Sequence, residues 1–198
     1  GKISVKKSLA YVMILCFFSF FILIQFNLLT ISLGLASMIL AFTYPFMKRF
    51  TYWPQLFLGL TFNWGIVMAW AAINNSVTLE IIVLYLSAIF WTLGYDTIYG
   101  VQDMMDDEII GLKSTSIKFK KNIKLFVSAA YFLCIAILAF LFYEELGTNL
   151  ISLFLTIFTL TLIYQIKKFH KKRPKDCLAA FKLNNFSGLL LFLGIFSI

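Results

Sequence analysis

Seven long apolar runs follow one another along the chain, and short polar segments separate them. Each run has roughly 18 to 22 residues, enough for a helix to cross the ~30 Å hydrocarbon layer of a membrane. None shows the alternation of apolar and polar positions that is typical of a barrel strand. The pattern therefore predicts an all-α, polytopic membrane protein with about seven transmembrane helices. The expected spans are residues 8–26, 30–47, 55–73, 78–99, 122–143, 149–166 and 181–198.

The composition supports this prediction and excludes a soluble globular protein. Mean hydropathy is +0.90, with 61% hydrophobic and 13% charged residues. Soluble domains carry about 25% charged residues. Since no polar segment is long enough to fold separately, residues 1–198 are expected to form a single transmembrane domain. Cys16, Cys134 and Cys177 are far apart, which predicts neither a disulfide framework nor a zinc site.

The basic residues predict how the chain is oriented in the membrane. They occupy every second loop, and Lys182 lies on the same side at the start of the last run. The basic segments are 2–7, 48–49, 113–124 and 167–175, whereas the loops at 27, 74–75 and 144–145 have no cation. Loops rich in Lys and Arg remain in the cytoplasm. We therefore predict an integral protein of the bacterial inner (cytoplasmic) membrane, and the net charge of +8 indicates lipid contact, with no nucleic acid as partner.

The most informative polar stretch is residues 94–114, which holds five of the nine acidic residues. If it forms one helix, Asp96, Asp103 and Asp107 lie within about 40° of one another. Asp103 and Asp107 are four residues apart, so they are neighbours on one face. Acidic groups at the edge of a membrane span are costly and therefore suggest a function. We predict a divalent-metal site; the alternative is a solvated, acidic end of a helix.

Carboxylates on one helical face suit Mg²⁺, which takes the rest of its ligands from water and substrate phosphates. Lys48, Arg49 and Lys113 are expected on the same side of the membrane and can bind phosphate oxygens. Aromatic residues, 18% of the chain, can line a groove for an apolar tail. Together these features predict a site for an amphiphile with a diphosphate head. Two simpler interpretations remain: Lys48 and Arg49 can anchor the chain at the lipid headgroups, and Asn63 can hydrogen-bond between helices.

Three segments carry a resemblance to a known family. Residues 95–107, YDTIYGVQDMMDD, followed by GLKST at 111–115, resemble the second aspartate-rich motif of the UbiA family of intramembrane aromatic prenyltransferases. Within that family they are most similar to the 4-hydroxybenzoate polyprenyltransferases. The segment YPFMKR at 44–49 resembles the family's Y-x-x-x-K segment, and residues 182–188 resemble the entry to its last helix.

The resemblance implies a fold of nine membrane helices around a cavity that opens laterally to lipid. It implies that Asp103 and Asp107 bind Mg²⁺ and diphosphate, with Asp96 and Asp106 as supporting substrate-binding candidates. The implied reaction is Mg²⁺-dependent transfer of a polyprenyl group from polyprenyl diphosphate to the ring of 4-hydroxybenzoate. Transfer ortho to the hydroxyl, in ubiquinone biosynthesis, is the expected outcome.

The same resemblance implies catalytic roles for Tyr44 and Lys48, near the diphosphate and the reacting carbon. Four further substrate-binding candidates complete the expected site. They are Arg49, Asn63, Tyr99 and Lys113.

One family feature is not found in these 198 residues. The family has a first aspartate motif, N-D-x-x-D, in an earlier cytoplasmic loop, and Gly1-Lys2-Ile3-Ser4 resembles the residues that follow it. We therefore expect two helices and the first metal-binding loop to lie upstream. With half of the metal site, the 198-residue chain is expected to be inactive by itself.

Two alternatives to this function remain open from the sequence. A prenyltransferase of the same superfamily can use another acceptor, such as a naphthoate, homogentisate or haem. A carrier or divalent-cation transporter can also line its pathway with carboxylates. Transporter sites usually lie near the membrane midplane, whereas these carboxylates are expected at one face.

Overall fold

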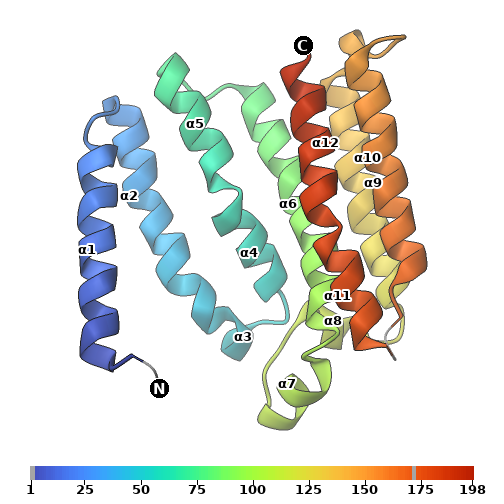
Figure 1. Cartoon of the computed structure of the whole chain (residues 1–198), viewed down its shortest axis with the longest axis horizontal. Coiled ribbons are helices and arrows are strands. Elements are labelled where there is room, and N and C mark those ends of the chain that lie inside the picture. The colour runs from blue at the N-terminus through green and yellow to red at the C-terminus, as the bar shows by residue number, and fades with distance from the viewer. Residues whose placement is uncertain (1–2, 171–172) are drawn as a thin grey trace.

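The computed structural model describes residues 3–170 and 173–198, which form an all-helical protein (Figure 1). Lys2 and residues 171–172, which belong to the predicted basic segments, lie outside the described residues. The helices, in chain order, are α1 (Val5–Leu23), α2 (Leu28–Thr43), η1 (Tyr44–Phe46), α3 (Met47–Phe50), α4 (Pro54–Phe62), α5 (Trp64–Asn74), α6 (Leu79–Gly100), α7 (Met104–Ile110), α8 (Thr115–Lys118), α9 (Ile123–Leu141), η2 (Tyr143–Glu145), α10 (Leu150–Lys168), α11 (Pro174–Lys182) and α12 (Asn184–Phe196).

Seven helical segments in the described residues are long and apolar enough to cross a membrane, which confirms the predicted spans. They are Val5–Leu23, Leu28–Phe50, Pro54–Asn74, Leu79–Gly100, Ile123–Leu141, Leu150–Lys168 and Lys175–Phe196. The first six agree with the predicted bounds to within about three residues, because hydropathy alone determines where a helix must enter lipid.

The seventh segment begins earlier than predicted. The expected start near Phe181 is wrong, because α11 already begins at Pro174, in the position where proline is favoured in a helix. Cys177 and Ala180 are buried on one face of α11, while Lys175 is exposed on the other. Such an amphipathic helix has a low mean hydropathy, and therefore the apolar pattern did not detect it.

The third span is divided at Asn63, which ends α4 and precedes α5. The Asn63 amide nitrogen donates to the Gly59 carbonyl oxygen at 2.9 Å, to the Ala88 carbonyl oxygen at 3.2 Å and to Thr92 Oγ1 at 2.8 Å. The Asn63 side chain thus connects α4 to α6 and supplies hydrogen bonds where the helix is interrupted. This geometry supports the interhelical interpretation of Asn63, and its substrate-binding role stays a prediction.

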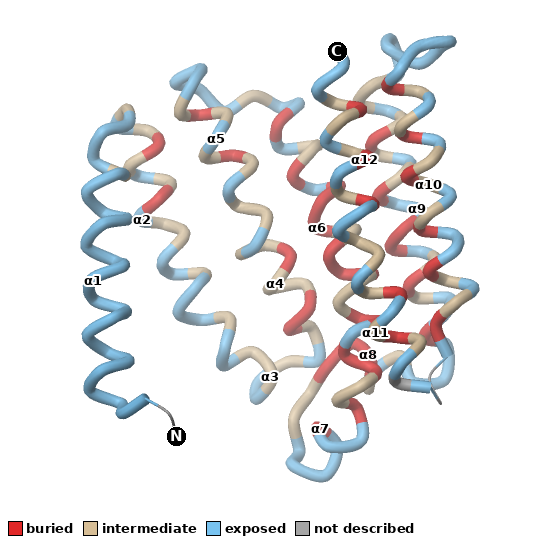
Figure 2. Tube along the Cα trace, in the orientation of Figure 1, coloured by how far each residue is buried: buried red, intermediate tan, exposed pale blue. Residues whose placement is uncertain are grey.

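The helices form an open arc with α6 at its centre (Figure 1). On one side α6 packs against α9 and α11, and α10 packs against α9, α11 and α12. On its other side α6 packs against α4 and α5, which in turn contact α2. Helix α1 packs on α2 and contains no buried residue. Burial is accordingly concentrated on α6, α9 and α10 (Figure 2).

A polar network joins four helices inside the larger core. The Tyr131 hydroxyl on α9 donates to Gln165 Oε1 on α10 at 2.5 Å. Gln165 Nε2 donates to Asn184 Oδ1 on α12 at 3.1 Å, and Trp91 Nε1 on α6 donates to the same oxygen at 3.0 Å. Gln165 and Tyr131 are almost fully buried. Because lipid offers no hydrogen-bond partner, these contacts fix how the four helices pack.

Gly94 on α6 allows the closest approach of α6 and α9. A Cβ atom added at Gly94 would lie 2.3 Å from Cε1 of the buried Tyr131 ring, whereas one at Gly65 on α5 would meet no atom within 4 Å. We expect Gly94→Ala to lower the free energy of unfolding, because overpacking costs about 1–3 kcal/mol. Gly65→Ala, the control, should be neutral or raise it by up to about 1 kcal/mol through helix propensity. Thermal unfolding in detergent checks both; equal stability of the two variants would contradict the packing.

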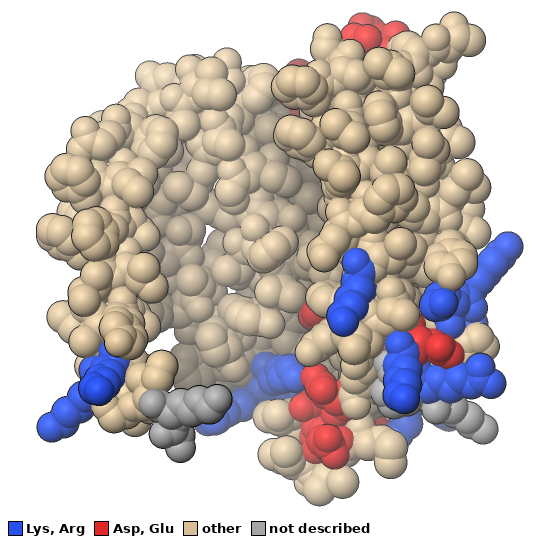
Figure 3. Space-filling view, viewed as in Figure 1, with Lys and Arg blue, Asp and Glu red and all other residues tan. Residues whose placement is uncertain are grey.

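The basic side chains lie at one end of the helices, whereas acidic side chains occur at both ends (Figure 3). Lys and Arg side chains gather at the end where α3, α7 and α8 lie, as the sequence predicts (Figure 3). The molecule is hollowed between the α1–α2 pair and α12, and this hollow reaches the same basic end (Figure 3). An apolar molecule can therefore enter from the side while its polar end meets the charged residues.

Candidate active site

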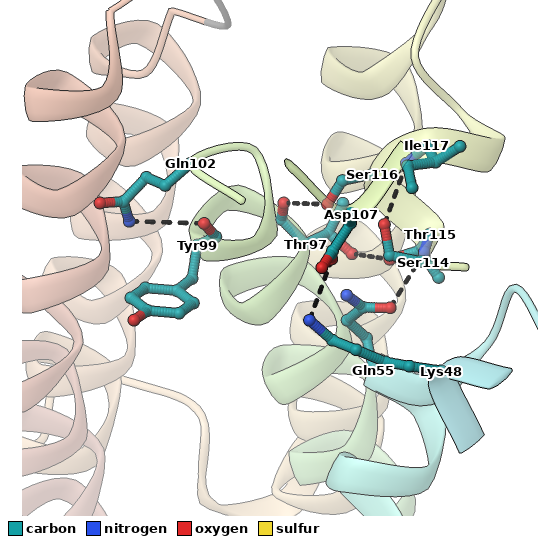
Figure 4. Close-up of polar contacts among 10 residues, drawn as sticks. All are labelled: Lys48, Gln55, Thr97, Tyr99, Gln102, Asp107, Ser114, Thr115, Ser116 and Ile117. Carbon is teal, nitrogen blue, oxygen red and sulfur yellow. Dashed lines mark hydrogen bonds and ion pairs between the residues drawn. The ribbon is translucent and has the colours of Figure 1, made fainter. Parts of the chain in front are cut away.

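Two short helices place Tyr44 and Lys48 at the basic end. Helix α2 continues into η1, in which Pro45 occupies the first turn, and then into α3. The turn tightens here because proline fixes φ and has no N–H to donate. Thr51 is extended and ends α3, so the chain reverses into α4. This arrangement directs Lys48 toward the acidic segment (Figure 4).

The acidic segment is not one continuous helix, and that prediction is wrong. Helix α6 ends at Gly100, a turn follows at residues 101–103, and α7 starts at Met104. Val101 in this turn and Met104 at the start of α7 are both buried. Asp96 therefore lies on α6 and not on the helix of Asp107. The predicted relation of Asp103 and Asp107 is confirmed, because the Asp107 amide donates to the Asp103 carbonyl at 2.8 Å.

Gly111 ends α7 and turns the chain back toward the membrane. Its φ is +81°, a left-handed conformation that favours glycine. The Leu112 amide donates to the Asp107 carbonyl at 2.8 Å, which closes the helix end. The next residue, Lys113, donates its backbone N–H to the Lys48 carbonyl at 2.8 Å. The helix end thus connects α7 directly to α3.

The central contact is an ion pair between Lys48 and Asp107, which are 59 positions apart. Lys48 Nζ donates to Asp107 Oδ2 at 3.0 Å (Figure 4). The Asp107 side chain is 9% exposed and that of Lys48 38%. A buried carboxylate requires a partner, which Lys48 supplies. Because Lys48 is partly exposed, its other N–H groups remain able to reach a ligand.

Further predicted residues share this electrostatic environment. Asp96 and Asp103 both act on Lys48, and Tyr44 is close enough to interact with Lys48 and Asp96. All five residues were predicted from two separate segments, residues 44–49 and the acidic stretch 94–114. The structure brings them together at one place on the basic end.

Buried hydrogen bonds anchor the segment that follows α7, and sequence reasoning missed them. Gln55 Oε1 on α4 accepts the Thr115 N–H at 2.9 Å, and the hydroxyls of Thr97 and Thr115 are 2.7 Å apart. Ser116 Oγ donates to the Thr97 carbonyl oxygen at 2.8 Å (Figure 4). All four residues are almost fully buried. The sequence feature that could have indicated these residues is the presence of polar, uncharged side chains at the ends of apolar runs.

Replacing Gln55 tests whether this anchor positions α7. In Gln55→Leu the buried Thr115 N–H loses its acceptor, so the free energy of unfolding should fall by about 1–3 kcal/mol. Amide hydrogen exchange in residues 104–118 should also become faster. Gln25→Leu serves as the control, because Gln25 is exposed and bonds only to the Phe21 carbonyl four residues earlier. Unchanged exchange in Gln55→Leu would show that the anchor does not hold the acidic segment.

Three other predicted binding residues lie at the same end as the Lys48–Asp107 ion pair, and Tyr99 packs elsewhere. Lys113 Nζ donates to the Phe50 carbonyl oxygen at 3.4 Å, so it faces the end of α3. Arg49 and Asp106 are exposed at the same end. Tyr99 instead points away from the Lys48–Asp107 pair and packs on Phe181, with 4.7 Å between ring centroids (Figure 4). The structure therefore does not bring Tyr99 to the ion pair.

The carboxylates fit a metal that a substrate helps to hold. Among residues 3–170 and 173–198, no group of three or more His, Cys, Asp or Glu side chains could hold an ion. Asp107 already shares one oxygen with Lys48, while the Asp103 carboxylate caps no backbone N–H. Mg²⁺ needs only one or two carboxylates when phosphate oxygens complete its shell. Asp103 and Asp107 fit this arrangement and not a site made by protein alone.

The comparisons with known proteins agree with this geometry. The sequence matches the UbiA prenyltransferase family over residues 1–188. It is 42% identical over 175 residues to the mitochondrial 4-hydroxybenzoate polyprenyltransferase of Bos taurus, covering 88% of this chain and 47% of that one. It is 38% identical over 197 residues to the 4-hydroxybenzoate octaprenyltransferase of Vibrio vulnificus, covering 99% of this chain and 69% of that one. The chain thus spans about half the length of its mitochondrial relative.

A solved structure shows the same fold. The apo structure of a UbiA homolog from Aeropyrum pernix K1 superposes with a TM-score of 0.82 and covers 99% of this chain and 74% of that one. The two sequences are 23% identical, so this match concerns the fold alone. With the family match over residues 1–188 and relatives of about 40% identity, the chain belongs to the UbiA prenyltransferase family.

Proposed function

We propose that the protein transfers a polyprenyl group from polyprenyl diphosphate to the ring of 4-hydroxybenzoate, ortho to the hydroxyl, in ubiquinone biosynthesis. Family membership and the names of the relatives support aromatic prenyl transfer. The observation that carries the proposal is the Lys48–Asp107 pair, contributed by α3 and α7 at the basic end of the molecule. It places a cation and a carboxylate where the diphosphate of a membrane-embedded tail would lie.

The carboxylates and the cations divide the work of binding diphosphate. Asp103 and Asp107 would hold Mg²⁺, which neutralises charge on the departing diphosphate when bound. Lys48 keeps Asp107 in place and offers further N–H donors to a phosphate oxygen. Lys113 lies beside α3 and can donate to a second oxygen. These donors stabilise the transition state, in which negative charge develops on the departing diphosphate.

In the proposed reaction the protein positions the two substrates and stabilises the charge that develops on the diphosphate. The bond between the prenyl carbon and the diphosphate oxygen breaks, and the electron pair leaves with the oxygen. A ring carbon of 4-hydroxybenzoate then bonds to the prenyl carbon, and the ring proton passes to the released diphosphate or to water. Tyr44, next to Lys48 and Asp96, lies where it can contact the reacting groups. Holding both substrates in this geometry supplies much of the rate enhancement.

The bilayer is part of the proposed site. The polyprenyl tail would lie in the hollow between α2 and α12 and extend into lipid. The basic end would face the cytoplasm, following the distribution of Lys and Arg. In a bacterium this orientation places the reaction at the inner face of the cytoplasmic membrane, where a soluble aromatic acid can reach it.

The direct test is an assay of the protein expressed from its complete coding sequence. Membranes receive polyprenyl diphosphate and either 4-hydroxybenzoate, a dihydroxynaphthoate or homogentisate, with Mg²⁺ or with EDTA. We expect product from 4-hydroxybenzoate alone, lost with EDTA, and NMR of that product should place the new bond ortho to the hydroxyl. A preference for another acceptor would contradict the proposed substrate. Divalent-cation flux without any prenylated product would contradict the enzyme.

A further inference from the structure

A second polar site lies at the basic end, where α9 begins and α10 ends. It is an open pocket of about 620 Å³. Its wall contains the cations Lys121, Lys124 and Arg173 together with His170, and its apolar part includes Leu125 and Phe169. Among the residues that the structure describes, no acidic residue lines it and none of the predicted active-site residues takes part. The pocket is therefore separate from the Lys48–Asp107 site and has a positive charge of its own.

The three cations of this pocket, Lys121, Lys124 and Arg173, are exposed to solvent. Lys124 Nζ lies 5.4 Å from the centroid of the buried Phe169 ring, a cation–π distance. His170 Nδ1 donates to the Lys168 carbonyl oxygen at 3.0 Å, which orients the ring at the end of α10. Arg173 Nη1 lies 3.8 Å from Asp176 Oδ2, and the Arg173 side chain is 74% exposed. So loose a pair leaves the guanidinium able to bind another anion.

The pocket adjoins a lipid-facing surface. Helices α9 and α10 both span the membrane, and the pocket lies at their basic ends. Leu125 at the pocket and Phe132, seven residues later on the same face of α9, are 70% and 69% exposed. An acyl chain can lie along this face while its headgroup meets the cations. Basic pockets between membrane helices are well suited to acidic lipid headgroups.

We propose that this pocket binds the phosphodiester headgroup of an anionic phospholipid, whose acyl chains lie along the exposed face of α9. The combination of a cationic wall with an adjoining apolar stripe favours a lipid over a soluble anion. A bound lipid would connect the start of α9 to the end of α10. It would thereby hold the α8–α9 connection, which follows the anchored segment of the active site, at a fixed depth in the membrane.

Native mass spectrometry of the detergent-solubilised protein tests this proposal. Phosphatidylglycerol, phosphatidylcholine and inorganic phosphate are added separately, and the retained molecules are counted. We expect one tightly retained phosphatidylglycerol, with neither phosphatidylcholine nor phosphate retained. Removing two cations in K121Q/K124Q should weaken retention roughly tenfold or more. The charge-matched control K6Q/K7Q removes two lysines from α1, outside the pocket, and should retain the lipid.

Four further results would each support or overturn the proposed lipid site. Equal losses in K121Q/K124Q and K6Q/K7Q would indicate general attraction to a basic surface and overturn the pocket. Retention of inorganic phosphate to the same extent would overturn the lipid as ligand. K121R/K124R keeps both charges and should keep the lipid, which distinguishes a loss of charge from a loss of folding. Undiminished retention in K121Q/K124Q would also overturn the proposal.

Discussion

Lys48→Met is expected to lower prenyl transfer by about 10²–10³-fold, the usual cost of removing a donor to developing negative charge. The substitution removes a cation that lies 3.0 Å from Asp107 Oδ2. It also leaves that buried carboxylate without its partner. The effect should appear in kcat more than in KM, because charge on the diphosphate grows as the carbon–oxygen bond breaks. Rates at saturating polyprenyl diphosphate provide the measurement.

A double-mutant cycle separates the two roles of Lys48. If Lys48 acts chiefly by holding Asp107, then Lys48→Met combined with Asp107→Asn should be no slower than the slower single variant. If each residue contacts the diphosphate independently, the losses should multiply. Lys118→Met is the control for general charge at this end, since its ammonium lies over the Trp53 ring at 4.5 Å. A Lys48→Met variant as active as Lys118→Met would contradict the proposed site.

The parts of the fold that hydropathy governs could be predicted from the sequence. Six spans begin and end close to their predicted positions, because the cost of exposing polar backbone to lipid determines them. The turn at residues 101–103 and the early start of α11 could not be predicted in this way. Both lie at the membrane surface, where water and protein compete for the backbone and tertiary packing decides. The division at Asn63 depends on acceptors supplied by α6, which the local sequence does not show.

The sequence predicted on which side of the membrane the candidate site lies, but not which of its residues contact one another. The distribution of Lys and Arg placed Lys48 and the acidic segment on the same face. That Lys48 meets Asp107 depends on how α3 and α7 pack, over 59 positions of sequence. Gln55 and Thr115 show the same limit, because each has its partner in a distant helix or loop. The resemblance to family motifs supplied the predicted roles of Tyr44 and Asp103, for which local physical reasoning offered several alternatives.

Asp103→Asn is expected to reduce prenyl transfer by about 10³-fold or more, because an amide is a poorer ligand for Mg²⁺ than a carboxylate. Asp103 directly precedes α7 and belongs to the charge cluster around Lys48. Unlike Asp107 it has no ion pair with the described residues, so its loss should disturb folding little. The variant should unfold at the temperature of the unmodified protein and still be inactive.

Binding and activity measured together decide whether Asp103 acts through the metal. Inorganic pyrophosphate should bind the unmodified protein more tightly with Mg²⁺ than with EDTA, and Asp103→Asn should remove that difference. The matched control is Glu108→Gln on the same helix, because Glu108 pairs with Lys120 at 2.6 Å and belongs to no predicted site. It should retain transfer to within about twofold, as surface ion pairs contribute little. Full activity of Asp103→Asn with an unchanged Mg²⁺ requirement would remove Asp103 from the metal site. Mg²⁺ would then have to be held by Asp107 together with another carboxylate, for which Asp96 is the candidate.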